Sequence, residues 1–131
     1  MSEKEALQCK VVFLGESGVG KTSIIYRYIL NSFSQGLTST AGASYTIKCV
    51  YIKDNNRSIK FEIWDTSGKT KYRSLAKVFF RNASACILVY DITKRESFEE
   101  LKNYWIKEIR ANSFSSQSNI NSFNFIISFL Q

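Results

Sequence analysis

The sequence has little that would indicate secretion, a membrane span or a metal cluster. Residues 1–5 hold no apolar signal segment, and no apolar run approaches the length of a transmembrane helix. The three cysteines, Cys9, Cys49 and Cys86, lie in apolar stretches without the spacing of metal ligands. We therefore expect buried free thiols in a reducing, cytoplasmic compartment. Since Gln131 is the last residue given, we expect no prenyl anchor on a terminal cysteine.

Positive charge is in excess but is not clustered. The chain has 18 Lys and Arg against 11 Asp and Glu, which gives a formal net charge of +7. Such a balance occurs in proteins that bind nucleic acid or anionic lipid. The basic residues are scattered, however, and a soluble surface with a phosphate site explains the charge equally well. We therefore expect no nucleic-acid partner.

Length and composition are those of one globular domain, with 131 residues of which 44% are hydrophobic. Apolar patterns predict strands at residues 9–14, 45–53, 58–64 and 85–90, and helices at 21–31, 75–81 and 97–109. A turn signal at 54–57 joins two of these strands into a hairpin. Ser97 and Glu100 have the spacing of a capping box at the start of the last helix. Strands that alternate with helices predict a doubly wound α/β sheet.

The composition of the chain changes near Asn112. Between Asn112 and Asn124 nearly every residue is Ser, Asn or Gln, and the apolar run 125–130 follows. That run is either a final strand or an exposed apolar tail. We therefore treat residues 1–131 as a single domain in which 112–131 form an atypical tail, and we expect this tail to be foreign to the domain, for instance through mis-splicing.

The most informative segment is residues 15–22, which fit the phosphate-loop pattern G-x-x-x-x-G-K-[ST] between a predicted strand and a predicted helix. Glycines let successive backbone N–H groups point into one cavity, and the helix N-terminus adds a field that favours anions. Lys21 is then placed to reach the β- and γ-phosphates, and the Thr22 hydroxyl to ligate Mg²⁺. The segment therefore predicts a nucleoside triphosphate site.

Two further positions fit such a site. Ile59, Phe61 and Ile63 alternate inward along a predicted strand that leads to Asp65, where a carboxylate can hold Mg²⁺ through water. By itself Asp65 is equally well explained as a turn residue. Gly68 is placed to give its N–H to a γ-phosphate.

The chain resembles the small GTPases of the Ras superfamily, and is most like the Rab family. The residues that carry the resemblance are GESGVGKT at 15–22, STAGASY at 39–45, WDTSGKTKYRSL at 64–75, FFRNASACILVYDIT at 79–93 and SFEELKNYWIKEI at 97–109. It covers about residues 9–110 and lacks the family's C-terminal part. It implies a three-layer P-loop NTPase fold, with a mostly parallel sheet and one antiparallel hairpin strand. It also implies a GTP/GDP switch with Mg²⁺ that acts in vesicle-mediated intracellular transport, associated with membranes.

The resemblance also implies roles for individual residues. Nucleotide binding falls to Gly15, Ser17, Gly18, Val19, Gly20, Lys21, Thr22, Ser23, Phe33, Thr40 and Gly68. Thr22, Thr40 and Asp65 would hold the metal. Phe33 matches the aromatic residue that packs on guanine, although a simple loop-packing role fits it too. Residues 34–44 and 65–75 match the two switch loops, which the γ-phosphate orders.

Tyr45, Trp64 and Phe79 match the aromatic triad through which Rab proteins contact effectors. Since Ile63 faces inward, Trp64 is expected to face outward with Lys60 and Glu62. The resemblance therefore implies effector, exchange and activating proteins as partners at this triad and at the switch loops. Scattered aromatics in a chain that is 15% aromatic are the alternative.

The chain departs from the family at two places. Lys69 stands at the position of the catalytic glutamine, and lysine has three donors but no acceptor with which to orient a water molecule. This predicts slow GTP hydrolysis, so that enzyme activity is low. In the window assigned to the family's guanine-reading Asn-Lys-x-Asp motif, Asn124 fits, but Phe125 and Ile127 replace the Lys and the Asp.

Three functions are therefore compared. The first is a Rab-like GTP-binding switch, and the second is a truncated Rab-like interaction module with weak or no nucleotide binding. The third, a general P-loop ATPase or kinase, has no support in residues 39–93.

Overall fold

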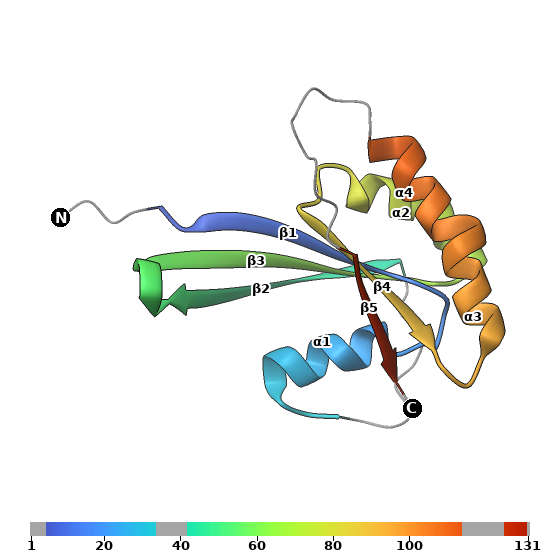
Figure 1. Ribbon diagram of the computed structural model, residues 1–131, viewed down its shortest axis with the longest axis horizontal. Helices are drawn as coiled ribbons and strands as arrows, with labels where there is room; N and C mark the ends of the chain where they lie inside the picture. The colour runs from blue at the N-terminus through green and yellow to red at the C-terminus, as the bar shows by residue number, and fades with distance from the viewer. Residues whose placement is uncertain (1–4, 34–41, 114–124, 131) are drawn as a thin grey trace.

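The computed structural model describes residues 5–33, 42–113 and 125–130, which form a sheet with helices on both faces (Figure 1). The strands are β1 (Leu7–Leu14), β2 (Ala43–Ile52), β3 (Arg57–Thr66), β4 (Ala85–Asp91) and β5 (Phe125–Leu130). The helices are α1 (Lys21–Leu30), α2 (Arg73–Phe80), α3 (Arg95–Glu100) and α4 (Ile106–Ser113), with short 3₁₀ turns η1 (Lys53–Asn55) and η2 (Thr70–Tyr72). A π-helical turn, η3 (Leu101–Trp105), connects α3 to α4. The predicted elements are confirmed, with ends that differ by a few residues.

The sheet confirms the predicted fold class. Its strand order in the described residues is β2-β3-β1-β4-β5. β1 is parallel to β3 and β4, and β4 is parallel to β5, whereas β2 and β3 form the one antiparallel pair among the strands that the structure describes. Because parallel strands all point the same way, the carboxyl ends of β1, β3 and β4 meet at one edge, where α/β proteins bind ligands.

Alternating side chains of the central strands build one core on each face of the sheet. On one face, strand and helix residues pack into the cluster Val12, Leu14, Ala76, Phe80, Ala83, Cys86, Leu88, Leu101, Trp105 and Ile109. On the other, α1 contributes to the cluster Val11, Phe13, Val19, Ile25, Ile63 and Val89. Both faces are covered, which is the three-layer arrangement expected of a mainly parallel sheet.

The predicted capping box is wrong, because the helix begins at Arg95, two residues before Ser97. The Ser97 hydroxyl is buried and donates to the Lys94 carbonyl at 2.7 Å, while the Asp91 N–H donates to it at 2.9 Å. The Glu100 carboxylate instead accepts a hydrogen bond from Arg73 at 2.9 Å. Ser97 therefore fastens the turn after β4 rather than the end of a helix.

The run 125–130 is a strand, so the first of its two interpretations is confirmed. β5 pairs with β4 in a continuous register from Cys86 opposite Phe125 to Asp91 opposite Leu130. The polar segment 114–124 that precedes it lies outside the described residues.

The sequence predicts that all three cysteines are buried, and this prediction is wrong for at least one of them. Cys86 is buried in β4 and Cys9 is half-buried, but Cys49 is exposed. Cys49 lies on β2, which among the described strands pairs with β3 alone and so forms an edge of the sheet. The apolar stretch around Cys49 therefore predicted the strand correctly, but it did not predict that this side chain is exposed.

None of the helices in the described ranges combines the length and apolar character that a membrane crossing requires.

Candidate phosphate and magnesium site

The phosphate loop follows β1 directly and depends on its glycines. Gly15, Gly18 and Gly20 have φ values of 148°, 78° and 104°, a region that residues with side chains rarely adopt. A Cβ on Gly15 would also lie 2.2 Å from the Val89 carbonyl oxygen of β4. The backbone between β1 and α1 is therefore folded into a tight turn pressed against β4.

Lys21, the first residue of α1, is buried beneath this loop with only 6% of its surface exposed. Its Nζ donates to the Gly15 carbonyl at 2.8 Å and to the Glu16 carbonyl at 2.7 Å. Burial lowers the pKa of Lys21 to about 8, against the opposing charges of Asp65 and Glu16. The loop thus holds a desolvated amine whose charge a phosphate would stabilise.

Thr22 and Asp65 meet beside this amine. Thr22 Oγ1 donates to Asp65 Oδ2 at 2.5 Å, and Asp65 is buried at the end of β3. Hydroxyl and carboxylate oxygens are ligands that Mg²⁺ accepts. No group of three His, Cys, Asp or Glu side chains lies together in the described ranges. The donor set therefore fits an Mg²⁺ that takes one or two protein ligands and completes its shell with phosphate and water.

The segment after Asp65 lies against the phosphate loop. A Cβ on Gly68 would be 2.2 Å from the Glu16 carbonyl carbon and from the Ser17 nitrogen, so only glycine allows this approach. Thr66 supports the segment, since its buried hydroxyl donates to the Phe13 carbonyl at 2.6 Å. The structure thus brings Gly68 beside the phosphate loop. The hydrogen bond of Gly68 to a γ-phosphate stays a prediction, and the role of Thr66 was missed.

Other predicted site residues lie at the surface or outside the described residues. Lys69 is exposed, and its backbone N–H donates to Ser67 Oγ at 3.3 Å. Phe33 lies just after α1 with 54% of its surface exposed. Thr40 and most of the segment 34–44 lie outside the described residues.

Arg73, at the start of α2, joins the site to the helices and was not found from the sequence. Its Nη2 donates to Glu16 Oε1 of the phosphate loop at 2.5 Å and to Glu100 Oε2 of α3 at 2.9 Å. The guanidinium lies 4.3 Å from the centre of the Tyr104 ring. Burial opposes its charge, but the hydrogen bonds and charges of Glu100 and Glu16 outweigh this and raise the pKa of Arg73. The three segments are far apart in sequence, so no local pattern signals the contact.

The three predicted aromatic residues do form one group. The Tyr45 and Trp64 ring centres are 4.7 Å apart, and those of Trp64 and Phe79 are 5.1 Å apart. Lys10 Nζ lies 5.7 Å from the centre of the Trp64 ring. Trp64 is half-buried rather than exposed, which corrects the prediction that its side chain faces outward. Its face of the sheet is partly covered by Phe79 of α2, and Tyr45, at 44%, is the most exposed of the three.

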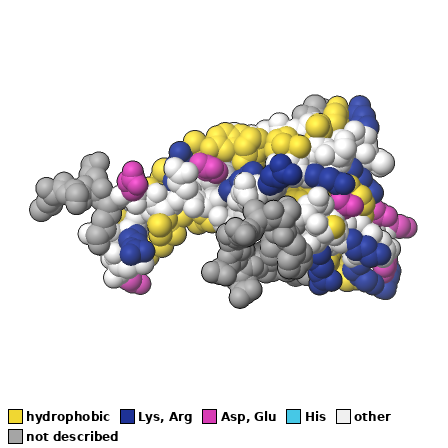
Figure 2. Space-filling view, turned by 90° about the horizontal axis from the view of Figure 1, so that it is seen from above, with side chains coloured by type: hydrophobic (Ala, Val, Ile, Leu, Met, Phe, Trp, Pro, Cys, Tyr) yellow, Lys and Arg dark blue, Asp and Glu magenta, His cyan; other side chains and the backbone are white. Residues whose placement is uncertain are grey.

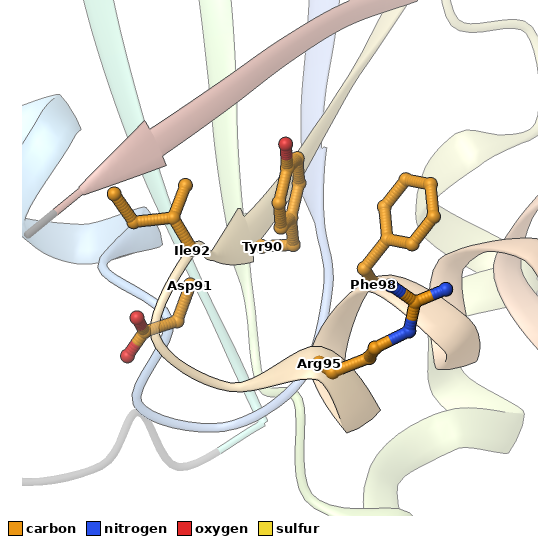
Figure 3. Close-up of a pocket in the computed structure, with 5 residues that line it drawn as sticks. All are labelled: Tyr90, Asp91, Ile92, Arg95 and Phe98. Atoms are coloured by element: carbon orange, nitrogen blue, oxygen red, sulfur yellow. The ribbon is translucent and has the colours of Figure 1, made fainter.

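A hollow of about 290 Å³ lies at the carboxyl end of β4 (Figure 3). It is lined by Tyr90, Asp91, Ile92, Arg95 and Phe98. The Tyr90 and Phe98 rings are 5.1 Å apart on one side of it. Thr93 donates its hydroxyl and its N–H to Asp91 Oδ1, at 2.6 and 2.8 Å, which lowers the pKa of Asp91. Sequence reasoning did not identify this hollow.

The predicted position of the guanine-reading window is wrong. Phe125 and Ile127 lie inside β5, opposite Cys86 and Leu88 of β4. Residues that read a bound base belong at the carboxyl edge of the sheet, which β5 reaches only at Leu130. The lack of Lys and Asp at 125 and 127 therefore carries no information about the base.

Comparison with known proteins gives consistent matches. The model of the Ras family matches residues 10–124. Ras-related protein Rab-22A of Homo sapiens is 47% identical over 103 residues, which are 79% of this chain and 52% of that protein. Ras-like GTP-binding protein RYL2 of Yarrowia lipolytica is 42% identical over 108 residues, 82% of this chain and 50% of that protein. GTP-binding protein YPT52 of Saccharomyces cerevisiae is 42% identical over 110 residues, 79% of this chain and 47% of that protein.

The chain spans about half the length of the curated relatives that it matches. The family match nevertheless covers most of the chain and continues past Arg110. Two of the segments that carry the sequence resemblance, 15–22 and 64–75, form the phosphate loop, the Thr22–Asp65 contact and the close approach of Gly68 to that loop. The chain belongs to the Ras family, as a Rab-like small GTPase.

Proposed function

We propose that the chain binds GTP and GDP with Mg²⁺ and acts as a molecular switch. The buried amine of Lys21 is the observation that carries this proposal. It is held by two backbone carbonyls, Gly15 and Glu16, inside a glycine loop. A buried ammonium group is costly unless an anion or several acceptors surround it, and phosphate oxygens meet that need.

Different residues of the chain bind the phosphates and the metal ion. Backbone N–H groups of residues 15–22 and the start of α1 hold the phosphates, while Lys21 exchanges its carbonyl partners for phosphate oxygens. Thr22 and Asp65 are already in contact and would hold Mg²⁺, with Thr40 as a second hydroxyl. When bound, Mg²⁺ neutralises charge on the β- and γ-phosphates. Gly68 donates its N–H toward the γ-phosphate, which links the switch segment to the state of the nucleotide.

Guanine is the proposed base. Two of the relatives are GTP-binding by name, and the family match includes the residues before and after the phosphate loop. Phe33 presents an exposed ring after α1, where it can pack on a base. Ser17, Gly18, Val19, Gly20 and Ser23 complete the proposed contacts to the nucleotide.

Hydrolysis is proposed to be slow because of Lys69. Its side chain has no acceptor and cannot orient a water molecule as glutamine does. Single-turnover hydrolysis by the natural chain and by Lys69→Gln tests this, and we expect the variant to be faster. Equal rates would contradict the assignment, and GTP affinity measured on both proteins shows whether binding is unchanged.

Effector, exchange and activating proteins are the proposed partners, in vesicle-mediated transport at a membrane. Tyr45, Trp64 and Phe79 support this, because their rings form one group at the edge of the switch segment. The same group favours a second candidate, an interaction module that binds nucleotide weakly or not at all. The ring contacts among Tyr45, Trp64 and Phe79 involve no phosphate-loop residue, so they do not require a bound nucleotide.

Titration with GTP, GDP and ATP, each with and without Mg²⁺, separates these functions. We expect Mg²⁺-dependent binding of both guanine nucleotides and much weaker binding of ATP. Lys21→Ala should weaken binding by about tenfold or more, since it removes a charged hydrogen bond to phosphate. Lys53→Ala, at an exposed lysine of η1, is the matched control. Binding of no nucleotide would favour the interaction module, and equal affinity for ATP and GTP would contradict guanine specificity.

A further inference from the structure

The phosphate loop, residues 15–22, contains one acidic residue, Glu16. A carboxylate is unfavourable in a loop that binds phosphates, because its negative charge repels theirs. Glu16 lies close to the site, since its own backbone carbonyl accepts a hydrogen bond from Lys21 Nζ at 2.7 Å and its charge acts on that amine. Its side chain is 27% exposed, so water screens this charge incompletely. A cation beside Glu16 would therefore make the loop better suited to a triphosphate.

Arg73 supplies a cation at this place. Its Nη2 donates to Glu16 Oε1 at 2.5 Å, and the arginine side chain is itself only 18% exposed. Figure 2 shows one face of the molecule, on which Lys, Arg, Asp and Glu side chains lie at the surface, where water and salt screen their charges. The charges of Glu16 and Arg73 are screened less because both side chains are largely covered. Arg73 therefore counters the charge of Glu16 beside the loop.

Contacts outside the phosphate loop fix the position of this guanidinium. Glu100 of α3 accepts a hydrogen bond from the same Nη2 at 2.9 Å, and the centre of the Tyr104 ring lies 4.3 Å from the guanidinium carbon. The segment 65–75 thus approaches Glu16 twice. Gly68 lies against its backbone, and Arg73 pairs with its carboxylate. The charge state of the loop therefore depends on where this segment lies.

We propose that Arg73 prepares the phosphate loop for a nucleotide by neutralising Glu16. The inference rests on the nucleotide switch proposed above and deepens it, because nucleotide affinity then depends on a residue that acts through Glu16. When the segment 65–75 moves so that Arg73 leaves Glu16, the carboxylate repels the phosphates and affinity falls. Arg73 is therefore a positioning residue for the phosphate loop.

Titration of the natural chain and its variants with GTP and with GDP, in the presence of Mg²⁺, tests the proposal. Arg73→Met should weaken the binding of both nucleotides about tenfold or more, because Glu16 is left without its cation. Glu16→Gln added to Arg73→Met should restore affinity to within about threefold of the natural chain, since no charge remains to be neutralised. Arg57→Met makes the same change at an exposed arginine at the start of β3. It is the matched control and should bind as the natural chain does.

Glu100→Gln separates the effect of charge from the effect of structure. It weakens the contact of Arg73 with α3 but leaves Arg73 beside Glu16, so affinity should stay within about threefold of the natural chain. Urea unfolding of each variant without nucleotide reports how much stability the change removes. If Arg73 served the fold alone, affinity would fall with stability in Glu100→Gln as well, and Glu16→Gln would not restore it.

Two results would overturn the proposal while leaving the nucleotide switch intact. A double variant that binds GTP as weakly as Arg73→Met would show that Arg73 acts on the phosphates directly or on the fold, and not through Glu16. Unchanged affinity in Arg73→Met would show that the charge of Glu16 does not reach the phosphates. In both cases the natural chain still binds GTP. A natural chain that binds no nucleotide would instead contradict the proposed function, and this inference with it.

Discussion

At the scale of single residues, the phosphate loop shows how one missing side chain shapes the site. Gly15→Ala would place a Cβ 2.2 Å from the Val89 carbonyl at a φ of 148°. Because the obstacle is backbone in a central strand, we expect a loss of about 2 kcal/mol or more in the free energy of unfolding, measured with urea. Gly18→Ala is the control. It has a positive φ but nothing within 4 Å of the new atom, so it should lose less. Equal losses would contradict the steric account.

Lys21 gives a second prediction at this scale, through its pKa. Burial lowers that pKa from 10.5 to about 8, so the unfolded chain binds this proton more tightly than the folded chain does. Between these two values, stability conferred by Lys21 therefore rises with pH, by up to about 3 kcal/mol. Below pH 8 both states are protonated and the pH dependence vanishes.

The measurement for Lys21 is urea unfolding of the natural chain and of Lys21→Met without nucleotide. The difference between the two proteins cancels groups that titrate in both. We expect the free energy of unfolding of the natural chain to increase relative to that of Lys21→Met as pH rises from about 8 to 10.5. A difference that stays constant over this range would show that the amine is not desolvated.

At the scale of elements, Arg73 holds the phosphate loop, α2 and α3 together. Its side chain is 18% exposed and contacts Glu16 and Glu100 at 2.5 and 2.9 Å. A double-mutant cycle with Arg73→Met and Glu100→Gln should give a coupling energy of about 1 kcal/mol or more, because a half-buried pair is weakly screened. The control pair is Arg95 and Glu99, 3.3 Å apart with the arginine 82% exposed, which should couple by about 0.5 kcal/mol or less. Similar values for the two pairs would contradict a structural role for Arg73.

The same scale shows what sequence patterns can and cannot predict. The strands and α1 follow from periodicity because burial of alternate or helical faces is a local property of the chain. The phosphate loop follows from its glycines for the same reason. Arg73 and the half-burial of Trp64 depend on contacts between segments that only the fold brings together. The capping-box prediction failed because Ser97 has the sequence spacing to Glu100 of a true capping box, whereas its buried hydroxyl bonds Asp91 and Lys94 instead.

At the scale of the whole molecule, the order of strands decides which parts are protected. Cys86 lies in β4, between β1 and β5, with no exposed surface, and burial raises the pKa of its thiol to about 12. Cys49 lies on the edge strand β2 and is exposed. The identity of the neighbouring residues predicted the same environment for both, since both stretches are apolar. Strand order, which depends on long-range pairing, makes them different.

Labelling of thiols by an aromatic disulfide reagent therefore reports on the whole fold. Cys49 should react quickly in the native protein, whereas Cys86 should react only when the sheet opens. For a domain of ordinary stability, this slows Cys86 by about a thousandfold or more relative to the unfolded chain. Cys49→Ser should remove the fast phase, and Cys86→Ser should leave it unchanged. A Cys86 that reacts as quickly as Cys49 would contradict a closed central sheet, and with it the framework that holds Lys21, Thr22 and Asp65 together.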